Sequence, residues 1–310
     1  MKALTQTAFG TDPEPTDLPL PEPGPGEVRV RVQAASVNGF DLAVAAGYLD
    51  GVLEHRFPLV LGKDFAGAVD AVGPDVTGYT VGDPVFGVVN KAHLGEGSFA
   101  EYVTVPLSGL AHIPDGLDTA TAGALGLAGT AALDALDAAT VRPGETVLVA
   151  GATGGVGSLV VQYAAAAGAT VIATAHTDAE RALVTGLGAA ETVDYTQDVA
   201  AGVRAARPDG VDVVFHLAGD PATLAQAVAS TGRFLSTLLQ SPDQVDADGA
   251  TVIAVTANPT TATLERLAQG QLDGTARVTV EHTYPLEAGA EALAHFRRGT
   301  LGKIALTTTA

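Results

Sequence analysis

The eight residues Ala-Gly-Ala-Thr-Gly-Gly-Val-Gly at 150–157 constrain the fold of this chain more than any other segment. A strand-like run at 145–150 leads into them, and an apolar run with helical character at 158–165 leads out. A strand, a glycine turn and a helix in this order direct backbone N–H groups and a helix N-terminus at one point, an arrangement that binds a diphosphate. The segment therefore predicts a dinucleotide-binding site and, with it, a redox enzyme.

Composition narrows the class of protein further. The chain has 310 residues, enough for two domains, and it is 47% hydrophobic and 16% charged, which predicts packed cores. A net charge of −19 argues against nucleic acid as a partner and against an anionic membrane surface, because both require basic patches. The chain contains no cysteine, which excludes disulfides, thiolate nucleophiles and cysteine-ligated metals. No run is apolar and long enough to suggest a signal core or a membrane span, so we expect a cytoplasmic protein.

The first part of the chain has the pattern of short strands. Residues 28–32 alternate apolar and polar side chains with period two, as a half-buried strand does. Further strands are predicted at 66–72, 84–89 and 99–105, separated by turns that contain glycine and proline. Short strands at this spacing favour a small, partly closed barrel.

The pattern changes near residues 114–116, after which helical stretches alternate with strands and predict a parallel sheet wound on both faces. One of the helices is predicted over 158–167. The strands of this sheet are predicted at 146–150, 170–174, 191–194, 211–215, 233–237 and 251–256. Beyond Asn258 the predicted elements are a helix at 261–269, a strand at 277–280, a helix at 287–296 and a strand at 303–306. This tail is too short to fold alone, so we expect it to return to the first domain.

Six segments in order make the chain similar to the medium-chain dehydrogenase/reductase superfamily, and within it to the zinc-free, zeta-crystallin-like quinone oxidoreductases. They are Ala35–Asp41, Leu61–Gly67, Val81–Val85, Gly97–Tyr102, Ala128–Ala131 and Gly299–Ile304. The resemblance implies an α/β fold in which a GroES-like, β-rich catalytic domain is interrupted by a Rossmann domain with a doubly wound parallel sheet. The expected domains are 1–115 (catalytic), 116–257 (cofactor-binding) and 258–310 (the return to the catalytic domain). The resemblance also implies a homodimer.

The chain departs from the zinc-dependent members at the positions that hold their metal. Those enzymes place a cysteine near Gly39 and a histidine in a Gly-His-Glu turn, whereas this chain has no cysteine and reads Gly62-Lys63-Asp64. Lysine is a poor zinc ligand at neutral pH, and the seven histidines are scattered. We therefore expect no metal site.

The glycine turn and the strand after it indicate the cofactor. The predicted diphosphate site is the turn itself, with Ala152, Thr153, Gly154, Gly155, Val156 and Gly157. No carboxylate follows the strand at 170–174 until Asp178, which has an alternative role at a helix N-terminus, and a missing acid favours NADPH because it removes repulsion against a 2′-phosphate. The other predicted cofactor residues are Thr174, His176, Arg181, Tyr195, Leu217 and Ala218. For Arg181 a solvated helix face is the alternative, and for His176 an exposed loop.

The resemblance also implies candidates for the chemistry. Asn38 and Thr130 match positions that orient the nicotinamide or polarise the substrate, and Asp41 either serves the same end of the site or stabilises a turn. Tyr48 matches a tyrosine that lines the substrate cleft, where it is either a proton donor or a half-buried packing residue. Lys63 reaches the cleft or forms a structural ion pair.

These features lead to one principal hypothesis and two alternatives. The principal hypothesis is a zinc-independent oxidoreductase that transfers a hydride from NADPH to a small-molecule quinone or related conjugated carbonyl (an enone). The alternatives are an enoyl-thioester or enone reductase and a non-catalytic NADPH-binding protein with a sensor or structural role.

Overall fold

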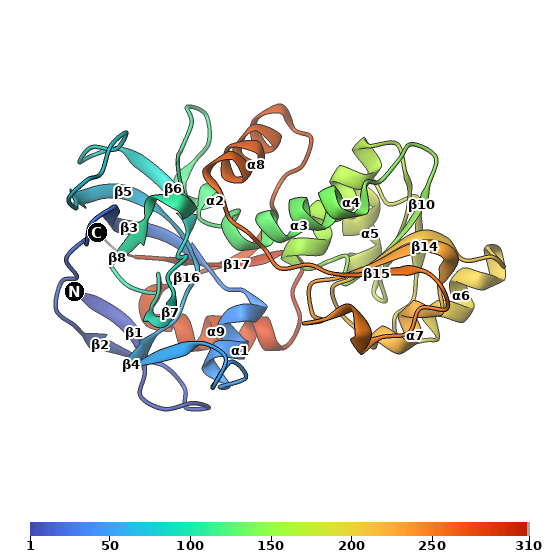
Figure 1. Cartoon of the computed structure of the whole chain (residues 1–310), viewed down its shortest axis with the longest axis horizontal. Helices are drawn as coiled ribbons and strands as arrows, with labels where there is room; N and C mark the ends of the chain where they lie inside the picture. Colours follow the sequence, from blue (N-terminus) through green and yellow to red (C-terminus); the bar gives the residue numbers. More distant parts are fainter. Residues whose placement is uncertain (309–310) are drawn as a thin grey trace. The chain divides into compact units, whose positions relative to one another are not determined.

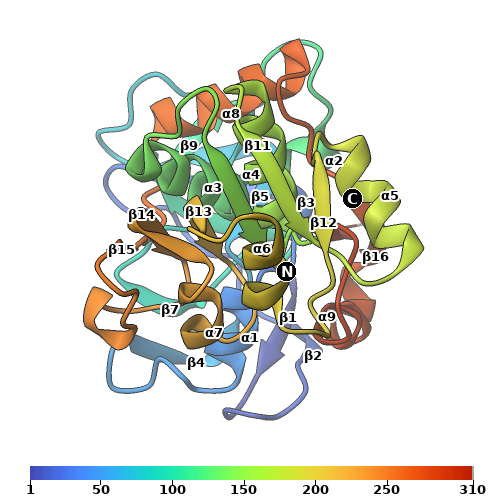
Figure 2. The same ribbon diagram turned by 90° about the vertical axis from the view of Figure 1, so that its right-hand side faces the viewer.

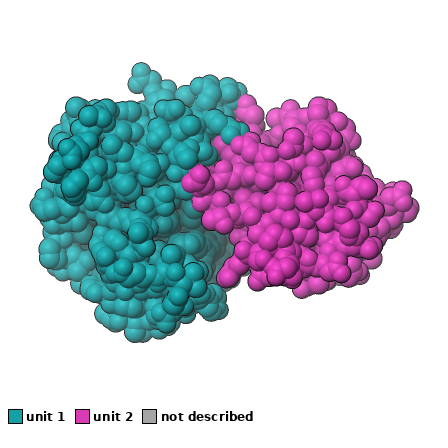
Figure 3. Space-filling view, in the orientation of Figure 1, with its two compact units in different colours: residues 1–128, 259–273, 280–310 teal, residues 129–258, 274–279 magenta. Residues whose placement is uncertain are grey.

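The computed structural model describes residues 1–308 and divides the chain into two compact units (Figure 3, teal and magenta). Unit 1 comprises residues 1–128 and 259–273 and the segment that starts at 280, and unit 2 comprises residues 129–258 and 274–279. Within residues 1–308, no helix combines the length and the apolar character that crossing a bilayer requires.

Unit 1 is built on two β-sheets (Figure 1). The larger sheet has the order β16-β17-β3-β5-β6-β9, and β8 pairs with β3 beside this path; the smaller sheet has the order β2-β1-β4-β7. The strands are β1 (Lys2–Gln6), β2 (Glu14–Asp17), β3 (Glu27–Ser36), β4 (Glu54–Val60), β5 (Asp64–Val72), β6 (Pro84–Val88), β7 (His93–Glu96), β8 (Tyr102–Pro106), β9 (Leu110–His112), β16 (Val280–Pro285) and β17 (Lys303–Thr307). The helices are α1 (Gly39–Ala45), α2 (Thr119–Ala122), α8 (Thr261–Asp273) and α9 (Gly289–Arg297), with 3-10 turns at Leu107–Gly109 and Leu286–Ala288.

β3 is the long central strand of unit 1. Val28, Val30 and Val32 are buried on one face while Arg29 and Arg31 point away from the core, which confirms the period-two prediction. β3 pairs antiparallel with β5 along most of its length, with β8 over Glu27–Arg31 and with β17 over Ala34–Ser36. Its C-terminal end therefore lies between β5 and β17, which come from distant parts of the chain.

Two strand predictions in unit 1 were wrong in their bounds. The strand expected at 99–105 begins only at Tyr102, although Phe99 and Ala100 are fully buried. The Phe99 N–H donates to the Leu61 carbonyl and the Phe99 carbonyl accepts from Leu4, so this stretch forms only an isolated bridge to β1 and no continuous ladder. The strand expected at 277–280 starts only at Val280. The side-chain amide of Gln162 occupies both backbone groups of Arg277, with distances of 2.9 Å to its O and 2.8 Å from its N.

Unit 2 is a doubly wound sheet of six parallel strands in the order β12-β11-β10-β13-β14-β15 (Figure 2, green to orange). The strands are β10 (Thr146–Ala150), β11 (Thr170–Thr174), β12 (Glu191–Val193), β13 (Val211–His216), β14 (Val228–Ser236) and β15 (Thr251–Ala254). The helices are α3 (Gly126–Ala139, which begins in unit 1), α4 (Gly155–Ala166), α5 (Asp178–Gly186), α6 (Val199–Ala206) and α7 (Pro221–Ala225), with a 3-10 turn at Pro242–Gln244. The predicted α/β class, with a GroES-like part and a Rossmann-type sheet, is confirmed.

Burial on both faces explains the apolar strands of unit 2. Val147, Leu148 and Val149 of β10 are all fully buried; the valines belong to one core and the leucine to the other. A parallel strand covered by helices on both faces has this continuous apolar pattern rather than an alternating one. The carboxyl ends of these strands carry the segments that form the site in unit 2.

Candidate functional site

The glycine turn lies between β10 and α4, as the sequence predicts. Gly151 has φ +86°, a left-handed conformation that favours glycine, and Gly154 is the N-cap of α4. A Cβ atom on Gly157 would lie 2.1 Å from the Gly151 carbonyl oxygen, so this glycine lets the helix approach the turn. A Cβ atom on Gly154 would have no neighbour closer than 3.6 Å, and no side chain caps the helix N-terminus. The turn therefore leaves room for an anionic group beside the first N–H groups of α4.

Three predicted cofactor residues lie around this turn. The Thr174 hydroxyl accepts from the Gly151 N–H at 3.0 Å and donates to the Val149 carbonyl at 3.3 Å, so this 4% exposed side chain braces the strand ends. The Leu217 N–H bonds to the Ala150 carbonyl at 3.0 Å, and the ideal Cβ position of Gly151 lies 3.0 Å from the Ala218 Cβ. The ends of β10, β11 and β13 thus meet at the turn.

The remaining predicted cofactor residues gather at the end of β11 with two acids that sequence reasoning did not assign to the site. The Glu180 carboxylate accepts the backbone N–H groups of His176 and Thr177 at 2.6 and 2.9 Å, and the Tyr195 hydroxyl at 2.9 Å. The His176 Nδ1 lies 3.0 Å from both Asp194 carboxylate oxygens. The sequence signal for Glu180 was its position three residues after Thr177, which forms a capping box.

Electrostatics keep both acids ionised. Partial burial of Glu180 opposes its ionisation, but the N–H groups of Thr177 and His176 and the Tyr195 hydroxyl outweigh it and lower its pKa. Hydrogen bonds from the Thr196 N–H, with the largest effect, and from the His176 ring lower the pKa of Asp194 to about 2. The same contact with Glu180 raises the pKa of Tyr195, whose phenol stays protonated.

Unit 1 contains a buried ionic network at the C-terminal end of β3. Asp64 accepts hydrogen bonds from the Ser36 hydroxyl at 2.5 Å, the Asn38 amide at 2.8 Å and the Leu127 N–H at 2.6 Å, and its carboxylate lies 3.2 Å from the Lys303 ammonium. Lys303 also donates to the Val37 carbonyl at 3.0 Å and to the Asn38 side-chain oxygen at 2.6 Å. Asp64 is 0% exposed and Lys303 1% exposed, so each charge depends on the other.

This network occupies the whole amide of Asn38. Its Nδ2 group donates to the Ser36 carbonyl and to Asp64, and its Oδ1 accepts from Lys303. Sequence reasoning assigned Asn38 to the site but missed the pairing of Asp64 with Lys303, because 239 residues separate them. The only signal was that each belonged to a segment shared with the family.

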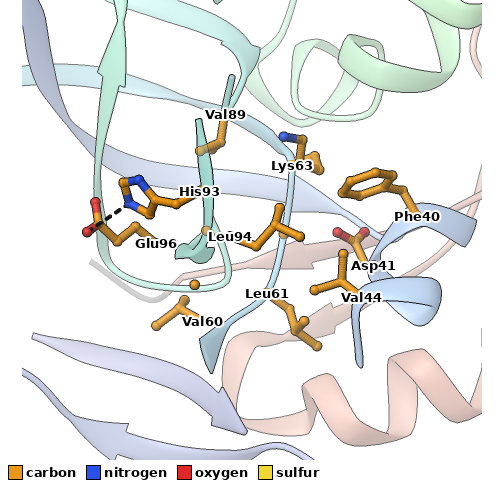
Figure 4. A pocket seen from close by; sticks show the side chains of 13 residues that line it. Phe40, Asp41, Val44, Val60, Leu61, Lys63, Val89, His93, Leu94 and Glu96 are labelled. Atoms are coloured by element: carbon orange, nitrogen blue, oxygen red, sulfur yellow. Dashed lines mark ion pairs between the residues drawn. The ribbon is translucent and has the colours of Figure 1, made fainter. Parts of the chain in front are cut away.

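Asp41 and Lys63 lie beside this network and line a pocket (Figure 4). Asp41 and Phe40 belong to α1, and Lys63 directly precedes β5. On β7, His93 and Glu96 form an ion pair with an N–O distance of 3.1 Å. The Lys63 Nζ lies 5.2 Å from the centre of the Phe40 ring and has no hydrogen bond or ion pair with any of residues 1–308. The pocket thus holds an ammonium group without a fixed partner among the described residues.

Burial governs the protonation of both groups. Asp41 is 1% exposed and its carboxylate accepts the Asn38 N–H at 2.8 Å. Burial, opposed by that hydrogen bond and reinforced by the charge of Asp64, raises the pKa of Asp41 to about 7, while Lys303 and Lys63 act in the lowering direction. Burial also lowers the pKa of Lys63. Near neutral pH Asp41 can therefore hold or release a proton.

Replacing Asp41 by asparagine should flatten the pH dependence of stability. The raised pKa means that the folded chain binds the proton more tightly than the unfolded chain, so this contribution is complete below pH 3.8 and is lost as pH rises through about 7. Relative to Asp41→Asn, the wild type should lose up to about 4 kcal/mol of unfolding free energy between pH 4 and pH 7. Urea unfolding of both proteins at several pH values measures this difference, and parallel curves would contradict the burial argument.

The other two residues predicted for catalysis lie in different units. Tyr48, which follows α1 in unit 1, is 78% exposed, so the half-buried packing role considered for it does not describe its position. Thr130, in α3 of unit 2, is fully buried.

The donor set does not fit a zinc ion. Lys63 stands in the turn where a histidine ligand is needed, and its neighbour Asp64 is bonded to Lys303. Across residues 1–308, no group of three or more His, Cys, Asp or Glu side chains is placed to hold a metal ion.

Two family models match the chain where these sites lie. The alcohol dehydrogenase GroES-like domain matches residues 24–115, and the zinc-binding dehydrogenase domain matches residues 155–237. A solved structure described as an NAD-dependent alcohol dehydrogenase is 31% identical and covers 100% of both chains, with a TM-score of 0.86. The chain belongs to the medium-chain dehydrogenase/reductase superfamily.

Other known proteins are similar to this chain over different lengths. The quinone oxidoreductase from Coxiella burnetii has a TM-score of 0.90 at 26% identity, covering 100% of this chain and 99% of that chain. A mycobacterial protein in complex with NADPH has a TM-score of 0.88 at 28% identity, covering 99% of each chain. The 2-methylene-furan-3-one reductase of Solanum lycopersicum is 34% identical over 64% of this chain and 51% of its own length. The phthioceranic/hydroxyphthioceranic acid synthase of Mycobacterium tuberculosis is 37% identical over 66% of this chain, which spans only 10% of that protein.

Proposed function

We propose that this medium-chain dehydrogenase/reductase is a zinc-independent oxidoreductase that transfers a hydride from NADPH to a quinone or a related conjugated carbonyl. The observation that carries the proposal is the glycine turn, which leaves methyl-sized space at Gly154 beside the uncapped N-terminus of a 12-residue helix. A diphosphate fits such a cradle because it accepts hydrogen bonds from backbone N–H groups and is stabilised by the helix dipole.

In this proposal, different residues of unit 2 bind different parts of the cofactor. The segment 152–157 holds the diphosphate, and Leu217 and Ala218 form the neighbouring wall at the end of β13. His176, Arg181 and Tyr195 lie at the ribose end, where NADPH carries its 2′-phosphate. When bound, the dihydronicotinamide supplies the hydride. The similarity to an NADPH complex supports this choice of cofactor.

The residues of unit 1 supply proton and orientation chemistry. Tyr48 presents an exposed phenol that can donate a proton to the oxygen of the acceptor as the hydride arrives. The amide of Asn38 is held rigid by Lys303 and Asp64, and Asp41 lies next to it with a pKa near neutrality. Thr130, which is fully buried, is the remaining residue proposed to orient the nicotinamide or polarise the substrate.

Conjugated carbonyls other than quinones are the second candidate class of acceptor. The name of the tomato relative describes reduction of a furanone with an exocyclic methylene group, which is a conjugated enone. An enoyl thioester presents the same electron-poor double bond. The chemistry required of the chain is unchanged, because each acceptor takes one hydride and one proton.

A substrate panel tests the proposal. We expect the purified protein to oxidise NADPH with at least one of a series of quinones, enones and enoyl thioesters, and to show no stimulation by zinc. Tight NADPH binding without turnover of any acceptor would instead favour the non-catalytic alternative. Cytoplasmic location and a homodimer stay predictions that fractionation and light scattering can check.

Replacing Tyr48 by phenylalanine should lower kcat with the best acceptor roughly a hundredfold, the size of effect typical for removal of a general acid. NADPH affinity should not change, because the substitution removes one oxygen from an exposed side chain. Steady-state kinetics give kcat, and fluorescence titration gives the affinity. Tyr79→Phe is the matched control, since the Tyr79 hydroxyl donates to the Leu110 carbonyl and has no proposed role. Equal kcat values for all three proteins would remove Tyr48 from the mechanism.

A further inference from the structure

A carboxylate from α5 lies at the C-terminal end of β11, although the strand itself has no acid there. The sequence at 174–177 lacks the acid that usually follows this strand, but Glu180 folds back from the first turn of α5 to the strand end. Its Oε2 accepts the N–H groups of His176 and Thr177, and its Oε1 accepts the Tyr195 hydroxyl. Three donors therefore converge on one side-chain carboxylate.

These donors are of the kind that a phosphate group needs. Two adjacent backbone N–H groups at a helix N-terminus and a phenol form an anion-binding set, and a carboxylate already occupies all three. A 2′-phosphate that uses this set has to displace Glu180. A ribose 2′-hydroxyl can instead donate to a carboxylate and leaves Glu180 in place.

The neighbouring basic side chains also contact carboxylates. His176 contacts Asp194, and Arg181 lies 3.4 Å from Asp178 and 4.0 Å from Asp194. The cluster contains three carboxylates, one guanidinium and one imidazole. The excess of carboxylates repels a 2′-phosphate.

We propose that Glu180 determines the ratio of NADPH to NADH binding by occupying the donors of the 2′-phosphate. The inference rests on the proposed function in that it requires a nicotinamide dinucleotide in unit 2. Glu180 acts as an internal competitor: it weakens NADPH binding and has little effect on NADH. The chain therefore retains measurable use of NADH even though it lacks an acid at the usual position.

Glu180→Gln tests the proposal with little change in shape. Glutamine retains an acceptor oxygen and is accepted at this position of a capping box, so α5 should be preserved. We expect NADPH to bind roughly tenfold more tightly, because a neutral amide holds these donors more weakly than a carboxylate does and the phosphate displaces it more easily. NADH affinity should change by less than about threefold, since its ribose lacks the charged group. Isothermal titration of both nucleotides at one fixed ionic strength gives the four dissociation constants.

Asp178→Asn is the matched control. It removes the same charge from the same helical turn, but the Asp178 side chain is fully exposed and does not hold the strand-end N–H groups. A shift in the NADPH to NADH ratio for Glu180→Gln that clearly exceeds the shift for Asp178→Asn supports the proposal. Equal shifts would assign the effect to net charge alone, and an unchanged ratio in Glu180→Gln would reject the role of Glu180. If neither nucleotide binds the wild type, the proposed function itself fails.

Discussion

Replacing Lys303 by methionine should destabilise the protein by about 3–5 kcal/mol, the usual result of removing one partner of a buried ion pair. Asp64 is 0% exposed, and its carboxylate would lose its charged partner while it keeps the neutral donors Ser36, Asn38 and the Leu127 N–H. The Val37 carbonyl and the Asn38 side-chain oxygen would lose their donor as well. Urea unfolding followed by circular dichroism measures the effect.

The double variant Asp64→Asn/Lys303→Met separates the charge effect from the loss of packing. Because it removes both charges, it should recover at least half of the stability lost in Lys303→Met. Arg56→Met is a surface control in the same unit: the Arg56 side chain is 51% exposed, so solvent screens its ion pairs and its removal should change the stability little. A Lys303→Met protein as stable as the surface control would contradict a structural role for the buried ion pair.

The elements that the sequence predicts well are those whose determinants are local. The glycine turn is specified by residues within one strand, one turn and one helix, and its conformational requirement can be recognised at Gly151 and Gly157. β3 shows its buried face through simple alternation. In both cases the interactions that decide the structure involve neighbours along the chain.

The features that the sequence did not predict depend on distant partners or on side chains that replace backbone contacts. The Asp64–Lys303 pair joins segments 239 residues apart, and no periodic pattern connects them. Residues before Val280 have the composition of a strand, but the Gln162 amide occupies the backbone groups of Arg277. Glu180 was recognisable as a helix-capping residue, yet only the folded chain shows that its carboxylate takes the place of the missing strand-end acid.

Alanine at Gly154 should weaken NADPH binding on the order of a hundredfold and leave the fold intact, if the turn cradles a diphosphate. The added methyl group would meet only the Gly151 carbonyl oxygen, at an ordinary contact distance of 3.6 Å, and Gly154 has φ −76°, which alanine adopts without strain. The methyl group would, however, fill the space beside the helix N-terminus where the diphosphate is proposed to lie. Fluorescence titration with NADPH and thermal unfolding of the same samples measure both effects.

Gly157→Ala provides the contrast that makes this test specific. Its methyl group would lie 2.1 Å from the Gly151 carbonyl oxygen and 2.8 Å from the Ala152 Cα, so α4 must move away from the turn. We expect a loss of about 1–3 kcal/mol or more in stability, because backbone atoms cannot yield as a flexible side chain does. NADPH binding of Gly157→Ala should weaken as well, but its melting temperature should fall at the same time. Weak binding in a protein of wild-type stability is therefore expected only for Gly154→Ala. If that variant binds NADPH as tightly as the wild type, the open side of the turn does not hold the diphosphate.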